Sequence, residues 1–131
     1  MNVRDAVEAD SDRLASLTGS PTDVMRNLVH DRTVRVAEID DRVEGFVSYD
    51  ADGSTVYVTQ LEGDAELCET LLGEPTRFAA REAMNVELLA MEADDATRTA
   101  AERAAFEDCG PGPRFDGTET IRYRWKPERT A

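Results

Sequence analysis

The sequence predicts an α+β (α/β) fold in which a mixed β-sheet is flanked by helices. Alternation of apolar and polar residues indicates consecutive strands over 33–61, and a helical period follows across 65–83. The apolar run over 86–91 then indicates a further strand, so strand, helix and strand form a right-handed parallel unit. We expect one domain over residues 1–126 and a short tail over 127–131.

The N-terminal quarter predicts one short strand, over residues 1–6, and two helices. Asp10 is expected to cap the first helix, and Gly19 to end it. Ser20 and Pro21 fit the cap and the first position of the second helix. Its buried stripe is Val24, Met25, Leu28 and Val29.

An antiparallel meander of three strands is expected next, at 33–39, 43–49 and 54–61. Asp40-Asp41 is suited to the first turn. Asp52-Gly53 is a strong hairpin signal for the second.

The helix expected over 65–83 contains Gly73-Glu74-Pro75, which predicts a kink or a break. The run over 86–91 is typical of a strand buried on both faces. Asp94 or Asp95 is expected to cap the next helix, which Gly110 would end.

The C-terminal segment predicts one antiparallel strand over 120–125. The preceding Pro111 and Pro113 leave little room for regular strand before it. Strict alternation places three side chains inward, Ile121, Tyr123 and Trp125, and three outward, Thr120, Arg122 and Arg124.

Carboxylates dominate the charge of the chain. The 28 Asp and Glu against 15 Lys and Arg give a net charge of −13, and Lys126 is the one lysine. This composition resembles that of proteins from halophilic archaea. It argues against a nucleic-acid partner, because binding to a phosphate backbone needs a basic face.

Other compositional features exclude further classes. The sequence lacks the run of about 18 apolar residues that a membrane span requires, and its start, MNVRDAVEAD, lacks a signal-peptide core. Cys68, Cys109 and the single His30 are too scattered for a metal site. We therefore expect a cytoplasmic protein with no metal and no membrane partner.

Residues 60–65, QLEGDA, lie between a predicted strand and a predicted helix. A helix start offers unpaired N–H groups and a partial positive charge, which together suit a diphosphate. A tight turn at Gly63 explains the same glycine without any ligand. Both interpretations stay open at this point.

The order of elements, together with QLEGDA, resembles the GNAT superfamily of N-acyltransferases over most of the chain. QLEGDA matches the acyl-CoA signature Q/R-x-x-G-x-G/A of that family letter by letter. The resemblance implies acetyl-CoA or another acyl-CoA as co-substrate, a small-molecule or peptide amine as acceptor, and is compatible with a homodimer. The residues that it implies for cofactor binding are Thr59, Leu61, Glu62, Gly63, Asp64, Ala65 and Glu66.

The catalytic residues are not assigned. The segment Phe106–Gly110 resembles the family's tyrosine followed by a helix-ending glycine, but it carries phenylalanine instead of a proton donor. Asp50 and Asp52 are candidates for a base, although both fit a turn equally well. Substitute proton donors would be Tyr49, Tyr57 or Tyr123.

Two functions therefore remain. The first is transfer of an acetyl or short acyl group to an amine, and an acidic surface would attract a cationic acceptor. The second is a GNAT-fold binding or regulatory protein without catalysis. It is favoured by the acids around Gly63, by the missing tyrosine and by the interruption expected at Gly73-Glu74-Pro75.

Salt should stabilise this protein. We expect the unfolding temperature to rise between about 0.1 M and about 1 M KCl, because the screening length falls from about 10 Å to about 3 Å and weakens repulsion between carboxylates. Circular dichroism melts would measure the change. Sorbitol at matched osmolality is the control, since it does not screen charge. An unfolding temperature that is independent of KCl would contradict this expectation.

Overall fold

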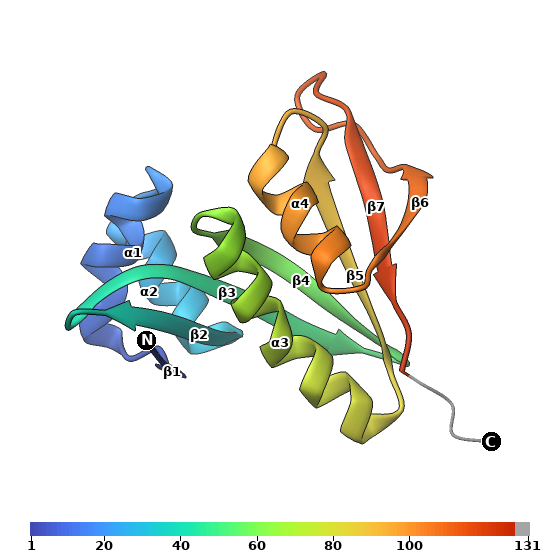
Figure 1. The fold of residues 1–131 in the computed structure, drawn as a ribbon. Helices are drawn as coiled ribbons and strands as arrows, with labels where there is room; N and C mark the ends of the chain where they lie inside the picture. Colours follow the sequence, from blue (N-terminus) through green and yellow to red (C-terminus); the bar gives the residue numbers. More distant parts are fainter. Residues whose placement is uncertain (128–131) are drawn as a thin grey trace.

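The computed structural model describes residues 1–127 and confirms the mixed α+β architecture. Within these residues the sheet has seven strands in the order β1-β2-β3-β4-β5-β7-β6 (Figure 1). Residues 128–131 of the expected tail lie outside the described part. The elements are β1 (Asn2–Asp5), a 3₁₀ turn (Glu8–Asp10), α1 (Ser11–Thr18), α2 (Thr22–Asp31), β2 (Thr33–Ile39), β3 (Arg42–Asp52), β4 (Thr55–Glu62), α3 (Ala65–Glu82), β5 (Asn85–Met91), α4 (Asp95–Arg103), β6 (Glu107–Pro111) and β7 (Thr120–Trp125).

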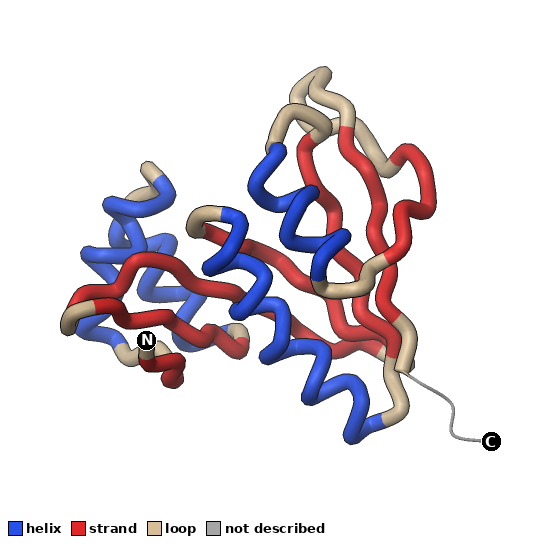
Figure 2. Tube along the Cα trace, viewed as in Figure 1, coloured by secondary structure: helices blue, strands red, loops and turns tan. Residues whose placement is uncertain are grey.

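Two hydrophobic clusters fill the two faces of the sheet. The smaller cluster joins α1 and α2 to β2 and β3 through Leu14, Met25, Val36 and Phe46. The larger cluster joins α3 and α4 to the other face and includes Leu71, Val86 and Tyr123 among its buried members. Figure 2 shows that both N-terminal helices, α1 and α2, lie at the β1–β3 end of the sheet. At the β5–β7 end, helix α4 packs on the face that holds the larger cluster.

The meander forms as predicted. Asp40 and Asp41 both adopt positive φ, 52° and 63°, which suits the tight turn between β2 and β3. Strand β2 has the predicted bounds, and β3 runs three residues further than expected, to Asp52. Gly53, at φ 62°, then turns the chain into β4.

Strands β4 and β5 pair in parallel over part of their length only. Their register runs from Thr55↔Asn85 to Val58↔Leu88 and then ends. A bulge follows in β4, since Ser48 of β3 pairs with Gln60 while Tyr49 pairs with Val58. Beyond it β4 stays paired with β3, and β5 stays paired with β7. The two strands therefore diverge after Val58 and Leu88.

Helix α3 is continuous, and the predicted break at Gly73–Pro75 is wrong. Pro75 lies inside the helix and is buried. Pro75 leaves the Leu71 carbonyl without its helical N–H donor, and the Thr76 hydroxyl donates to the next carbonyl, that of Leu72, at 3.0 Å. Burial of Leu71, Leu72 and Ala79 against the sheet stabilises the continuous helix.

Two predicted caps differ from the structure. Asp10 precedes α1, but its carboxylate accepts hydrogen bonds from Arg4 and from the Val7 N–H instead of from the helix. Helix α2 begins at Thr22, one residue later than expected. Pro21, in extended conformation at ψ 148°, takes the cap position that was predicted for Ser20. Asp94 caps α4 as predicted, since it accepts from the Thr97 N–H at 3.1 Å.

The end of α4 was predicted wrongly. The helix ends at Arg103, and Ala105 adopts the left-handed φ of 69° that usually ends a helix. Residues Glu107–Pro111 then form β6, an edge strand antiparallel to β7, where little strand was expected. An edge strand tolerates Pro111 because its terminal residue needs no partner on the outer side.

Strands β5 and β7 have their predicted places, and β7 is antiparallel as predicted. The prediction that β5 is buried on both faces is wrong, since Leu89 and Met91 are 37% and 41% exposed. On β7, Thr120 is buried although it was expected outward, because its hydroxyl donates to the Pro113 carbonyl beneath the β6–β7 connection. Along residues 1–127, none of the helices has the length and apolar character of a membrane-spanning segment.

The Asp10 carboxylate should be a stability determinant. It is buried and accepts two Arg4 hydrogen bonds, at 2.9 and 3.0 Å, and the hydrogen bonds from Arg4 lower the pKa of this carboxyl. We expect Asp10→Asn to lower the free energy of unfolding by about 2 kcal/mol at neutral pH. Urea denaturation would measure this loss.

The pH dependence follows from the lowered pKa. The Asp10 contribution is complete above the unfolded value of about 3.9 and is lost as the pH falls through the folded pKa. The difference between wild type and Asp10→Asn should therefore shrink below about pH 4. Asp12→Asn removes the same charge from an exposed position and is the control. Equal destabilisation by both variants would refute the assignment.

Candidate active site

The QLEGDA signature lies at a very short connection. Strand β4 continues to Glu62, so the first three signature residues belong to the strand, and only Gly63 and Asp64 lead into α3. Gly63 has φ 141°, a conformation that side chains rarely adopt, and an added Cβ would lie 3.1 Å from the Leu67 side chain. The turn thus requires glycine for its own geometry.

The start of α3 keeps part of its anion-binding capacity. The Asp64 carboxylate accepts from the Leu67 N–H at 2.8 Å and so occupies one donor of the first turn. The N–H groups of Ala65 and Glu66 have no acceptor among the described residues. Two backbone donors and the dipole of an 18-residue helix are therefore directed at this end.

The divergence of β4 and β5 creates a cleft next to that helix start. A cavity of about 240 Å³ lies between the β4 segment Val58–Glu62 and the β5 segment Leu88–Met91. Asp94 and Thr97, at the start of α4, close one side of it. In this cleft two strand edges face each other without forming a ladder. An extended ligand can therefore add main-chain hydrogen bonds as an extra strand does.

Polar groups of the cleft have distinct environments. Thr59, the residue at the bulge, has its hydroxyl 2.6 Å from that of Ser48. The Gln60 side-chain oxygen is buried and has no hydrogen-bond partner within residues 1–127. Burial, followed by the charge of Asp94, raises the pKa of the Glu62 carboxyl. Burial also raises the pKa of the Cys68 thiol to about 12, so Cys68 is a poor nucleophile.

A second cavity, of about 530 Å³, lies on the opposite face of the sheet. Leu88 and Ala90 are buried beneath the helices, so the alternate residues Leu89 and Met91 point to the other side. The two cavities share five lining residues and therefore meet where the strands diverge: Val58, Thr59, Leu88, Leu89 and Met91.

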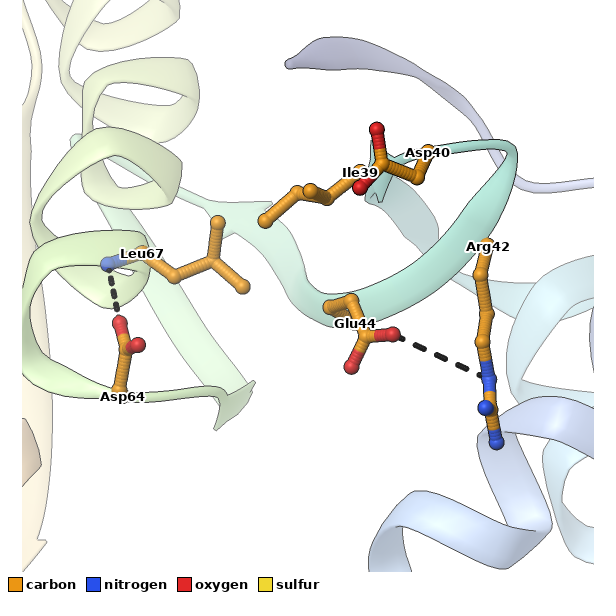
Figure 3. A pocket seen from close by; sticks show the side chains of 6 residues that line it. All are labelled: Ile39, Asp40, Arg42, Glu44, Asp64 and Leu67. Carbon is orange, nitrogen blue, oxygen red and sulfur yellow. Dashed lines mark hydrogen bonds and ion pairs between the residues drawn. The ribbon is translucent and has the colours of Figure 1, made fainter.

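A third hollow, of about 460 Å³, borders the start of α3 on the side of the β2–β3 turn. Figure 3 shows Arg42 and Glu44 on one side and Asp64 on the other. The Asp64 carboxylate is directed at its own helix, and Arg42 is paired with Glu44 at 3.8 Å. Arg42 is the cation that lines this hollow, so main-chain donors carry most of the anion-binding capacity at α3.

The candidate bases lie away from the cleft. Asp50 and Asp52 pair with Tyr57 and Thr55 near the closed end of β4, and Asp50 accepts from Arg32. The structure brings neither of them to the diverging ends of β4 and β5.

The candidate proton donors are separated as well. Tyr49 packs under α3 against Phe78, with ring centroids 6.3 Å apart, and the Tyr123 hydroxyl accepts from Arg98 at 3.2 Å. Tyr57 lines the second cavity.

The comparison of Phe106–Gly110 with a helix-ending segment is also wrong. Phe106 follows α4 in the core, and Gly110 lies in β6. Ala105 has the helix-ending conformation instead, and the residues a few positions before it include no tyrosine. None of the sequence patterns predicted the second cavity. The signal that could have indicated this cavity is the alternation along β5, which places Leu89 and Met91 on the same exposed face. The prediction that β5 is buried on both faces obscured it.

No protein-family model and no curated protein sequence matches this chain. Solved structures do match it along its length. A protein from Desulfovibrio desulfuricans assigned to the GNAT family of acetyltransferases has 21% identity and a TM-score of 0.74, with 95% of this chain and 98% of that chain covered. The ribosomal-protein-alanine N-acetyltransferase of Brucella melitensis has 17% identity and a TM-score of 0.79, with 96% and 99% covered.

A Salmonella typhimurium protein solved with acetyl-CoA has 17% identity and a TM-score of 0.80, with 100% of this chain and 96% of that chain covered. These likenesses extend over nearly all of both chains. The chain described here has the GNAT fold.

Proposed function

We propose that this protein transfers an acetyl or short acyl group from acyl-CoA to an amine. The observation that carries the proposal is the divergence of β4 and β5 after Val58↔Leu88, which joins a cleft on one face to a cavity on the other. The cleft would hold the thioester, and the amine would approach through the cavity. The structural neighbour that contains acetyl-CoA supports the choice of donor.

The residues of the cleft fit a CoA derivative in part. We propose that the free edge of β4 from Thr59 to Leu61 bonds the pantetheine arm. The Ala65 and Glu66 N–H groups would receive the diphosphate. Glu62 and Asp64 oppose this binding, since a like charge at 4 Å costs about 1 kcal/mol in water. Neutral backbone donors have to overcome that repulsion.

The reaction needs a neutral amine next to the thioester carbonyl. Its nitrogen forms the new C–N bond as the C–S bond breaks, and the CoA thiolate accepts a proton. No carboxylate is assigned as base. We propose that solvent in the open cavity takes the amine proton, while the Thr59 hydroxyl, held by Ser48, orients groups where the cavities meet. Positioning of this kind supplies much of the rate.

We further propose that the reaction takes place in a salt-rich cytoplasm. The net charge of −13 and the single lysine support the high salt. Cys68 and Cys109 are both free thiols, which is in keeping with a reducing compartment.

One observation favours the alternative, a GNAT-fold binding or regulatory protein without catalysis. The Asp64 carboxylate already occupies a donor at the start of α3. An aspartate at this position is a strong helix cap, so Asp64 stabilises α3 whether or not a ligand binds there.

Ala65→Pro should weaken acetyl-CoA binding without harming the fold. Proline is favoured at the first position of a helix, and the preceding Asp64 is extended at ψ 173°, as a residue before proline prefers. The variant removes only an N–H group that is unused in the helix. We expect the Kd for acetyl-CoA to rise at least about tenfold, the loss of one hydrogen bond to a charged acceptor.

The measurement is thermal unfolding in high KCl across an acetyl-CoA titration. For the wild type, ligand at about 100 times its Kd should add about 2.7 kcal/mol to the free energy of unfolding. Thr22→Pro places proline at the first position of α2 and is the matched control. An unchanged Kd in Ala65→Pro would place the diphosphate elsewhere. Binding without turnover of any amine would establish the alternative function.

Asp64→Asn should tighten acetyl-CoA binding. Asparagine caps a helix as well as aspartate does, so α3 keeps its Leu67 contact while a negative charge disappears beside the proposed diphosphate site. We expect a Kd about fivefold lower, from about 1 kcal/mol of relieved repulsion. Asp23→Asn, at the exposed start of α2, controls for net charge. If both variants bind acetyl-CoA equally well, Asp64 does not face the ligand.

A further inference from the structure

We propose that the acceptor is a monoamine with an apolar body, aliphatic or aromatic, and that this body occupies the second cavity. The inference rests on the proposed transferase function and names the substrate class that the cavity selects. The cavity would bind a small amine, and neither a polycationic acceptor nor a second copy of the chain.

The lining of the cavity is unusually apolar for this surface. Among the described residues, eight large hydrophobic side chains are exposed, and four of them line this one cavity: Tyr57 at 42%, Leu89 at 37%, Met91 at 41% and Phe115 at 48%. They come from β4, from β5 and from the β6–β7 connection. Their convergence from three segments forms a concave apolar wall of the kind that binds small ligands.

The charged groups of the cavity neutralise one another. Glu87 and Arg122 are the charged residues that line it. The Glu87 carboxylate lies 3.5 Å from Arg122 Nε and 3.4 Å from Arg124 Nη2, and its side chain is only 16% exposed. A carboxylate held by two arginines offers little to a second ammonium group. The described residues that line the cavity therefore offer no free anion to a polyamine, although the chain as a whole carries −13.

The charge balance of this cavity differs from what the net negative charge of the chain suggests. The acidic surface predicts attraction of cationic acceptors, yet among residues 1–127 the one carboxylate that lines the cavity, that of Glu87, is paired with arginines. Long-range electrostatic attraction affects how fast an acceptor associates, whereas contacts within the cavity determine which acceptor binds.

The β6–β7 connection, which contributes Phe115 to the cavity, is held in place by close packing. An added Cβ at Gly112 would lie 2.8 Å from Leu89 Cδ2, so the β6–β7 connection contacts Leu89 directly. Two backbone hydrogen bonds between Phe115 and Thr118, at 3.0 and 2.8 Å, close the turn that carries Phe115. The aromatic side chain is thus presented at the cavity by a defined turn.

Continuity with the cleft identifies the occupant as the acceptor. Thr59 and Leu89 line both cavities, so an amine whose apolar body lies against Leu89 and Met91 has its nitrogen at the gap between β4 and β5. The volume of about 530 Å³ falls in the range of small-ligand pockets, about 300–1,000 Å³. A second copy of the chain would cover the wall without using this opening.

The test is acetylation of phenylethylamine and hexylamine, compared with spermidine, at saturating acetyl-CoA. Leu89→Gln and Met91→Gln make the wall polar. Val7→Gln changes an exposed apolar residue at the N-terminal end and is the matched control. For each cavity variant we expect the KM for phenylethylamine to rise about tenfold, since apolar contacts of this size discriminate by about 10- to 200-fold. Phe115→Gln changes a residue that lines the second cavity but not the cleft, so it should also raise the KM for phenylethylamine while the KM for acetyl-CoA and kcat change little. Spermidine should be a poor substrate of the wild type.

A second measurement separates this inference from the proposed function. Ligand-observed NMR of phenylethylamine without CoA reports the cavity alone, and binding should disappear in Leu89→Gln but persist in Val7→Gln. Amine binding of this kind in a protein that never binds acetyl-CoA would refute the transferase while supporting the cavity as an apolar-amine site. The inference is overturned if spermidine has the lower KM or if the cavity variants behave like Val7→Gln. It is also overturned if sedimentation shows a wild-type dimer that Leu89→Gln dissociates.

Discussion

One constraint on the sheet governs the rest of this structure: β4 and β5 cannot stay paired beyond Val58↔Leu88. The bulge at Thr59 redirects β4 while its pairing with β3 continues, and β5 is held by β7 to Met91. Backbone groups that lose their ladder partners need other partners, because an unmade buried hydrogen bond is costly. The divergence therefore creates both a cleft between the two strands and an edge that can bond an extended ligand.

Electrostatics divides the site into two unlike halves. Glu62 and Asp94 line the cleft and Asp64 caps the adjacent helix α3, so an anionic ligand there depends on backbone donors at the start of α3. On the other face, the ion pairs of Glu87 with Arg122 and Arg124 leave an apolar wall with no net attraction for cations. A thioester on one side and an apolar amine on the other would meet at Thr59, which lines both cavities.

Where the structure departs from the sequence predictions, packing between distant segments has overridden a local rule. Proline disfavours a helix interior, yet burial of one face of α3 on the sheet keeps Pro75 within a continuous helix. Glycine usually ends a helix, yet Ala105 takes that conformation, and residues 107–111 pair with β7 instead. The alternation of β5 was hidden because Leu89 and Met91 are apolar although they are 37% and 41% exposed.

The sequence by itself determined the order of the helices and of the strands other than β6, the bounds of β2 and β7, a cap at Asp94 or Asp95, and the position of the QLEGDA turn. These features depend on side-chain periodicity and on local hydrogen bonding, which neighbouring residues specify. Only the tertiary structure decided where β4 and β5 part, which N–H groups of α3 remain available, and that residues from β4, β5 and the β6–β7 connection share one apolar cavity. Those properties arise from contacts between segments far apart in the chain, which no local pattern encodes.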